Sequence, residues 1–162
     1  MNKIIETWNY INRKYSSSEI YWRLTATNVS MFKILSGYLA DKRYSTALDA
    51  GAGNLAFKKI ISLAADKYYS FDFTNNNCGI DFIGDVRQMP CKDSAVDLVV
   101  CSAVLEHLPQ PQECVNEVFR AVRNNGTIVL TAPHFHYIHG EPADYWRFTE
   151  FGLAQLIDTA DI

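Results

Sequence analysis

A glycine turn stands at residues 48–54, in the segment Leu-Asp-Ala-Gly-Ala-Gly-Asn. It lies where an apolar, strand-like run ends and a helix-compatible stretch begins. Glycine permits positive φ and lets the backbone approach a ligand without an intervening Cβ. The spacing of Gly51, Gly53 and Ala56 fits a dinucleotide fingerprint, with Asp72 about 20 residues further on as a ribose ligand. The turn alone leaves open a dinucleotide, another nucleotide cofactor, or a turn without a ligand.

Three aspartates stand at the ends of successive predicted strands. Asp49 lies inside the first strand end, where its carboxylate can face a cationic ligand and would repel a pyrophosphate. Asp72 is placed for a ribose diol, and Asp85 for an adenine amino group. Each aspartate alone is more often an N-cap or a loop residue. Because the carboxyl ends of parallel strands meet at one ligand-binding edge, the three together favour a sulfonium cofactor with an α-amino group.

The elements that would position these residues form an alternating pattern from Ser45 onward. Strands are expected at 46–50, 68–73, 80–83, 96–101 and 127–131, and helices at 30–39, 55–65, 114–123 and from Thr149. The segment 124–126, Asn-Asn-Gly, reads as a helix stop. Apolar strands that do not alternate and are separated by helices predict a parallel sheet covered on both faces. Right-handed crossovers then give an α/β, doubly wound sheet.

From about residue 45 to residue 157 the chain resembles class I S-adenosylmethionine-dependent methyltransferases of the methyltransferase type 11 family. The matching segments are LDAGAGN, FDF, GDVRQMPCKDSAVDLVVCSAVLEHLPQP and the stretch after Gly126. The resemblance implies a Rossmann-like doubly wound sheet with strand order 3-2-1-4-5 and S-adenosylmethionine as cofactor. It implies contacts to the methionine end from Asp49, Gly51 and Ser102, to the ribose from Asp72, and to the adenine from Asp85 and the Val86 backbone, with Gly53 beneath the cofactor. The family usually has a third glycine where this chain has Leu55.

Candidate groups for the acceptor follow the fourth and fifth strands. His107 would act as a base or orient the acceptor, with Glu106 as its partner; the alternative is that both bond the loop backbone before Pro109. His134 and His136 are further catalytic candidates. The rest of the expected acceptor loop consists of His139, Asp144, Tyr145 and Arg147. The alternative for this segment is an aromatic lid in which Arg147 pairs with Asp144 or Glu141.

The three histidines at 134, 136 and 139 also raise the question of a metal. Imidazoles and carboxylates suit zinc, iron or manganese. An H-x-H-x-x-H pattern on a loop has no fixed facial geometry, however, and the family that the chain resembles does not generally need a metal. We therefore predict no metal site from the sequence.

Composition restricts the partners. The chain has 162 residues, is 48% hydrophobic, and carries a formal net charge of -3 with a pI near 5.8. Without a basic run, no nucleic-acid or membrane partner is expected. No apolar run approaches the ~20 residues of a membrane span, and no signal-like segment precedes the four cysteines. They read as reduced thiols of a cytoplasmic protein.

Two regions are expected, a helical segment at 1–44 that covers the cofactor pocket and a cofactor-binding domain at 45–162. By the resemblance this domain lacks the last two strands of the usual seven. The fifth strand would then be an exposed edge. A second copy of the chain in a homo-oligomer could cover it, and the alternatives are an N-terminal helix or the loss of a C-terminal segment. The resulting hypothesis is a methyltransferase acting on a small-molecule acceptor, with sugar-containing acceptors included. The alternatives are a non-catalytic S-adenosylmethionine-binding subunit and an NAD-dependent oxidoreductase.

Overall fold

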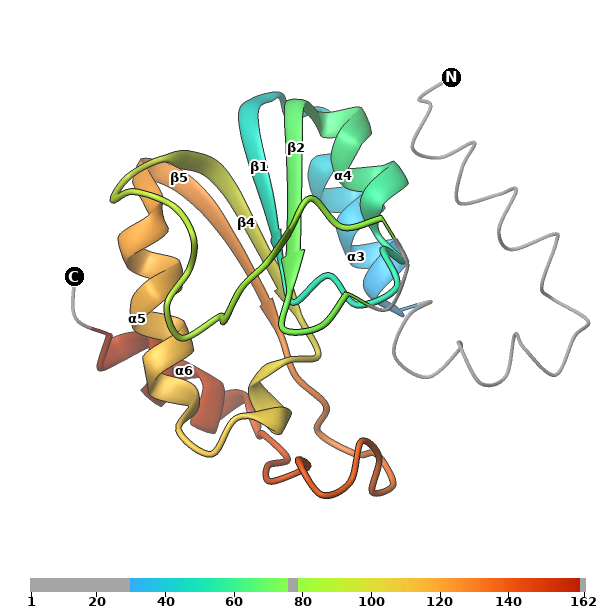
Figure 1. The fold of residues 1–162 in the computed structure, drawn as a ribbon, viewed down its shortest axis with the longest axis vertical. Helices are drawn as coiled ribbons and strands as arrows, with labels where there is room; N and C mark the ends of the chain where they lie inside the picture. Colours follow the sequence, from blue (N-terminus) through green and yellow to red (C-terminus); the bar gives the residue numbers. More distant parts are fainter. Residues whose placement is uncertain (1–29, 76–78, 161–162) are drawn as a thin grey trace, which may run out of the picture.

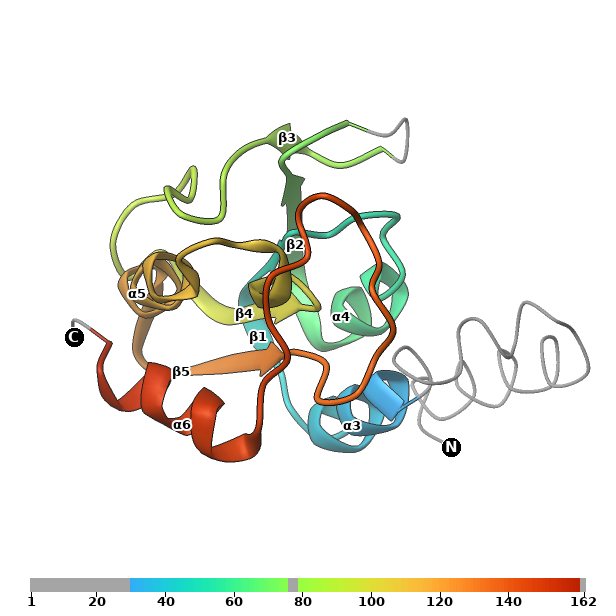
Figure 2. The ribbon, with the colours of Figure 1, turned by 90° about the horizontal axis from the view of Figure 1, so that it is seen from below.

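The fold is an α/β layer built on a five-stranded sheet with order β3-β2-β1-β4-β5. It is seen in a computed structural model that describes residues 30–75 and 79–160. The strands are β1 (Tyr44–Ala50), β2 (Ala65–Asp72), β3 (Phe82–Ile83), β4 (Val96–Ser102) and β5 (Val122–Thr131). Every neighbouring pair is parallel. The predicted fold class and strand order 3-2-1-4-5 are confirmed. All strands therefore end at one edge, which Figure 2 shows from below.

Helices cover both faces of the sheet (Figure 1). On one face lie α3 (Ser30–Leu39) and α4 (Lys58–Ala64), and on the other lie α5 (Pro111–Ala121) and α6 (Glu150–Asp158). The central strand β4 is buried on both sides, with Leu98 and Val100 in the core under α3 and α4, and Val99 and Cys101 in the core under α5. This explains why its sequence is a continuous apolar run. No helix in the described ranges is long and apolar enough to cross a membrane.

Two helix boundaries differ from the prediction. The helix expected at 55–65 begins only at Lys58 and ends at Ala64, because residues 51–57 continue as turns. The helix expected at 114–123 is α5 at Pro111–Ala121, with Pro111 in its first turn. Proline is favoured there because the first helical N–H groups have no intrahelical partner.

The Asn-Asn-Gly segment at 124–126 lies inside a strand, so its interpretation as a helix stop was wrong. The strand β5 begins at Val122, directly after α5, and pairs with β4. The register shifts between the Val96 and Leu98 pairings, and Asn125 has φ 63°. These residues thus form an irregularity within the strand, where asparagine tolerates left-handed backbone.

Two further expectations concern the edge strand β5 and the N-terminal segment. Among the described residues β5 pairs only with β4 and is an edge strand, so its coverage by a second copy stays a prediction. Of the segment expected to cover the pocket, residues 1–29 lie outside the described residues. The described part, α3, packs against α4 and the sheet, and none of its residues lines the cavity described below.

Candidate functional site

The glycine turn follows β1 at the carboxyl edge of the sheet and is fastened to β2. The N–H groups of Gly51 and Ala52 both donate to the Phe71 carbonyl, at 3.0 Å each. Gly51 has φ 70°, and a Cβ there would stand 2.5 Å from Cγ2 of Val104. Glycine is required at this position by both the backbone conformation and the close approach of the segment after β4.

Leu55 occupies the position where the resemblance places a third glycine. Its φ is 61°, in the left-handed region that glycine adopts freely and a leucine side chain disfavours. The backbone at Leu55 therefore has a conformation typical of glycine, with local strain at this residue.

Asp72 ends β2 and reaches back to the glycine turn. Its Oδ2 accepts a hydrogen bond of 2.8 Å from the Gly53 N–H. The carboxylate has lone pairs beyond this bond and lies in the wall of the cavity. Asp72 is therefore placed to accept hydrogen bonds from a ligand while it holds the turn.

Asp85 and Val86 stand after β3, in the same wall. The Asp85 carboxylate is paired with the Arg87 guanidinium, with Arg87 Nη2 2.6 Å from Oδ2. Hydrogen bonds from Arg87 hold the pKa of Asp85 below its usual value. Both Asp85 oxygens accept hydrogen bonds from Arg87, so the predicted contact to an amino group would share this carboxylate with Arg87.

Asp49 and Ser102, two predicted cofactor ligands, are not among the lining residues. Asp49 is buried in β1, where its Oδ2 accepts a hydrogen bond of 2.8 Å from the Tyr68 hydroxyl. Burial, opposed by this bond, raises the pKa of Asp49 to about 6. Ser102 shares a hydrogen bond of 2.9 Å with the Thr131 hydroxyl. Within the described residues, both side chains hydrogen-bond a residue of a neighbouring strand, and neither lines the cavity.

The cavity at this edge has a volume of about 530 Å³, a size typical of small-molecule sites. One part of its wall is the cofactor side predicted from the sequence, and the other is formed by the segments after β4 and β5. The lining residues used in the argument are Gly51, Gly53, Asp72, Asp85, Val86, His107 and Tyr145. The structure therefore brings five predicted cofactor ligands and two predicted acceptor residues into one space.

A short helical turn, η2 (Leu105–His107), contains His107, a residue expected on the acceptor side, and is hydrogen-bonded to the loop after β5. The Glu106 carbonyl accepts the Tyr145 N–H at 2.7 Å. The His107 Nδ1 bonds the Ala143 carbonyl, and Trp146 Nε1 donates to the Leu108 carbonyl at 2.8 Å. These contacts join two segments far apart in sequence into one wall (Figure 2).

The histidines of the loop have different surroundings. His134 is exposed and its Nδ1 bonds the Phe148 carbonyl at 2.9 Å. The Nδ1 of His136 lies 3.0 Å from the Tyr137 carbonyl. Neither lines the cavity, so the structure does not bring these two catalytic candidates to the site. His139 instead turns toward η2, where its ring meets that of His107 edge-on with centroids 4.8 Å apart.

Arg147 and Asp144 hold the loop together. The guanidinium makes two bonds to the Asp144 carboxylate, at 2.6 and 2.8 Å, and donates to three backbone carbonyls. The bonds from Arg147 to the Asp144 carboxylate, together with one from the His139 N–H, hold the pKa of Asp144 well below its usual value. Of the two interpretations given to Arg147, the structure shows the pairing with Asp144; neither residue lines the cavity.

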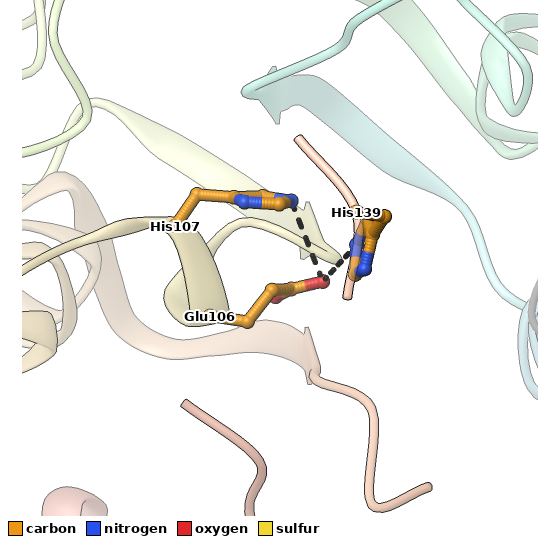
Figure 3. Close-up of side chains that lie close together, drawn as sticks. All are labelled: Glu106, His107 and His139. Atoms are coloured by element: carbon orange, nitrogen blue, oxygen red, sulfur yellow. Dashed lines mark ion pairs between the residues drawn. The ribbon is translucent and has the colours of Figure 1, made fainter. Parts of the chain in front are cut away.

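Glu106, predicted as a partner of His107, has surroundings that the sequence did not reveal. Its side chain is fully buried, and within the described residues neither carboxylate oxygen has a hydrogen-bond partner. Burial raises its pKa. Its Oε1 lies 3.9 Å from Nε2 of His107 and 3.8 Å from Nε2 of His139 (Figure 3). The available signal was a glutamate between apolar residues on one side and His107 on the other, in the segment Val-Leu-Glu-His-Leu.

Comparisons with known protein families, sequences and structures all find methyltransferases. Residues 48–130 match the family described as "Methyltransferase domain". A probable S-adenosylmethionine-dependent methyltransferase of Mycolicibacterium smegmatis is 30% identical over 78 residues, which cover 46% of this chain and 30% of the relative. The match thus spans less than a third of that relative's length.

Solved structures share the fold. A Bacillus halodurans protein assigned as a methyltransferase superimposes with a TM-score of 0.67 at 18% identity, covering 79% of this chain and 67% of the other. A Thermotoga maritima protein named as an S-adenosylmethionine-dependent methyltransferase gives a TM-score of 0.65 at 13% identity, covering 93% of this chain and 79% of the other.

Proposed function

The chain belongs to the methyltransferase domain family, and on that premise we propose that it transfers a methyl group from S-adenosylmethionine to a small-molecule acceptor. The observation that carries the proposal is the single cavity of about 530 Å³ at the carboxyl edge of the sheet. It is shared by Gly51, Gly53, Asp72 and Asp85 on one side and by His107 and Tyr145 on the other. Cofactor and acceptor residues thus face the same space.

The residues present fit an adenosyl cofactor. Asp72 offers free carboxylate lone pairs to a ribose diol, and Asp85 offers an acceptor to the adenine amino group beside the apolar Val86. At Gly53 no heavy atom lies within 4 Å of the place that a Cβ would occupy, so the backbone there is open to a ligand. Asp49, buried beneath the turn, adds negative potential at the end expected to hold the cationic methionine portion.

When bound, S-adenosylmethionine supplies a methyl group on a sulfonium whose thioether product is a good leaving group. The chain's part is to orient the acceptor and to exclude water. The joined wall of η2 and the loop after β5 provides a fixed surface for this, because one backbone–backbone and two side chain–backbone hydrogen bonds hold it. We assign the acceptor to the end of the cavity lined by His107 and Tyr145, and include hydroxyl-bearing acceptors such as sugars.

The same geometry disfavours a dinucleotide. In dinucleotide sites the pyrophosphate rests on the N-terminus of the helix that directly follows the glycine turn. Here α4 begins at Lys58, after further turns, and the Gly53 N–H is already bonded to Asp72. The buried Asp49 carboxylate would also repel a pyrophosphate at this turn.

Calorimetric titration of the full chain with S-adenosylhomocysteine and, separately, with NAD tests the cofactor. We expect binding of S-adenosylhomocysteine and none of NAD; the reverse result would overturn the proposal. Transfer of a labelled methyl group is then measured across a panel of small hydroxyl and amine acceptors. Cofactor binding without transfer to any acceptor would argue for a non-catalytic binding subunit.

A further inference from the structure

Three groups that can accept a proton or a metal converge behind the part of the cavity wall that His107 forms. The ligand atoms of Glu106, His107 and His139 all lie within 4.8 Å of one another. Figure 3 shows the Glu106 carboxylate directed toward both imidazole rings, with Glu106 and His107 coming from η2 and His139 from the loop after β5.

The hydrogen bonds of the two histidines fix which nitrogen carries the proton. The Nδ1 of His107 bonds the Ala143 carbonyl, and the Nδ1 of His139 lies 3.1 Å from the Tyr137 carbonyl. A carbonyl oxygen can only accept a hydrogen bond, so each Nδ1 must carry the proton and donate it. In the neutral ring each Nε2 therefore presents a lone pair, and both Nε2 atoms face Glu106.

With both rings neutral, three acceptors thus face one another without a donor between them. Neither oxygen of the buried Glu106 carboxylate has a hydrogen-bond partner in the described part of the chain, and a buried carboxylate without partners is costly. A cation placed among the three groups would satisfy all of them. Histidines that donate their other ring N–H to a backbone carbonyl are the usual arrangement of metal ligands.

We propose that Glu106, His107 and His139 form a site for a divalent first-row transition-metal ion of the zinc type. Two imidazole nitrogens and one carboxylate oxygen are a ligand set that such ions accept, with further positions left for water or substrate. Metal–ligand bonds of about 2 Å in a tetrahedral site put neighbouring ligand atoms roughly 3.3 Å apart. The separations of 3.8 and 3.9 Å to Oε1 therefore shorten when the ion binds.

The surrounding charge favours the ion. Asp144 Oδ2 lies 3.6 Å from Nδ1 of His139, and Arg147 pairs with Asp144. With Glu106 ionised, these charged groups sum to one negative charge beside two neutral imidazoles, which suits a dication.

The site has a consequence for the acceptor, and this step rests on the proposed function. His107 lines the cavity, so an ion bound to it lies at the cavity wall, where its open positions can bind an acceptor oxygen. A metal ion lowers the pKa of a bound hydroxyl. In this arrangement His107 serves as a ligand instead of a base, and the acceptor is hydroxyl-bearing.

Direct metal binding to the chelator-treated full chain, with no cofactor or acceptor present, tests the site. We expect one equivalent of Co²⁺ to bind with the visible absorption of a low-coordinate site, and Zn²⁺ to displace it. His139→Gln should weaken binding about 100-fold or more, because even outer partners of metal ligands contribute about 10- to 100-fold. His134→Gln, the same change in the same loop outside the cluster, should bind as the unaltered chain does.

Equal Co²⁺ affinity for the unaltered chain and His139→Gln would overturn the proposal, as would the absence of binding. A second measurement covers the case that a variant does not fold. The metal-free chain is compared with Glu106→Gln by infrared spectroscopy. A carboxylic acid carbonyl band that is assigned to Glu106 and persists when metal is added would show that a proton satisfies the cluster instead. Because these assays use no cofactor, loss of S-adenosylhomocysteine binding would count against the proposed function and leave the metal site standing.

Discussion

The carboxylate of Asp72, at the end of β2, accepts a 2.8 Å hydrogen bond from the backbone N–H of Gly53 in the turn after β1. One side chain thus sets the shape of the glycine turn and forms part of the cavity wall. Strand pairing makes this possible, because β1 and β2 are parallel neighbours and end side by side.

Replacing Asp72 tests the cofactor pocket. Asp72→Asn is expected to weaken S-adenosylhomocysteine binding roughly 10- to 100-fold, since hydrogen bonds to a charged group contribute about 1.5–3 kcal/mol. The measurement is calorimetry, with thermal unfolding to verify that the variant folds. Asp66→Asn is the matched control, because Asp66 is exposed at the other end of the same strand. An equal loss of S-adenosylhomocysteine affinity in the two variants would argue against Asp72 as the ribose ligand.

Leu55 offers a test of backbone strain. With φ 61° at this position, Leu55→Gly should be more stable than Leu55→Ala by about 1 kcal/mol, because both lose the leucine side chain and only glycine relieves the left-handed strain. At an ordinary helical position the order is reversed, with alanine favoured by about 0.5–1 kcal/mol. Urea unfolding of the two variants measures the difference. Alanine as the more stable residue would show that the turn is not strained.

The buried Asp49 should make stability depend on pH. Its pKa is raised from 3.8 to about 6 when the chain folds, so the folded state binds the proton more tightly than the unfolded state does. The stabilising contribution is complete below about pH 4 and is lost as the pH rises through about 6. The shift corresponds to on the order of 3 kcal/mol.

Asp49→Asn removes this titration and leaves an acceptor for the Tyr68 hydroxyl. We expect a flatter profile of unfolding free energy against pH and a variant more stable than the unaltered chain at pH 8. Asp66→Asn, at an exposed site, should keep the original profile. If Asp49→Asn kept it as well, another group would be responsible for the pH dependence.

Arg147 should matter for the order of the loop after β5. Arg147→Lys loses the two-bond pairing with Asp144 and most bonds to the loop carbonyls, because an ammonium cannot reproduce the planar fork of a guanidinium. Limited proteolysis should then cut between residues 134 and 146 faster than in the unaltered chain. Arg43→Lys, at an exposed arginine with one bond to the neighbouring Lys42 carbonyl, is the control. An unchanged cleavage rate with weaker acceptor binding would instead support direct contact between Arg147 and the acceptor.

Much of the fold follows from local sequence patterns. The continuous apolar run of β4 predicts a strand buried on both faces, and the alternation with helices predicts parallel pairing. The order 3-2-1-4-5 came from the family resemblance and is the order of the observed sheet. Since parallel strands end at one edge, the residues that follow them, Asp72 and Asp85, are brought to one cavity. These features depend on side-chain periodicity and chain connectivity, which are present in the sequence itself.

Other features were decided by the tertiary structure. Glu106 and His139 are distant in sequence and belong to segments without regular periodicity, so their meeting depends on how the loop after β5 packs on η2. The same packing separates His139 from His134 and directs Arg147 into the loop. A short window of sequence specifies which residues are polar and where strands end. Only the packed chain determines which side chains are buried without partners, because burial and hydrogen bonding are properties of segments brought together by folding.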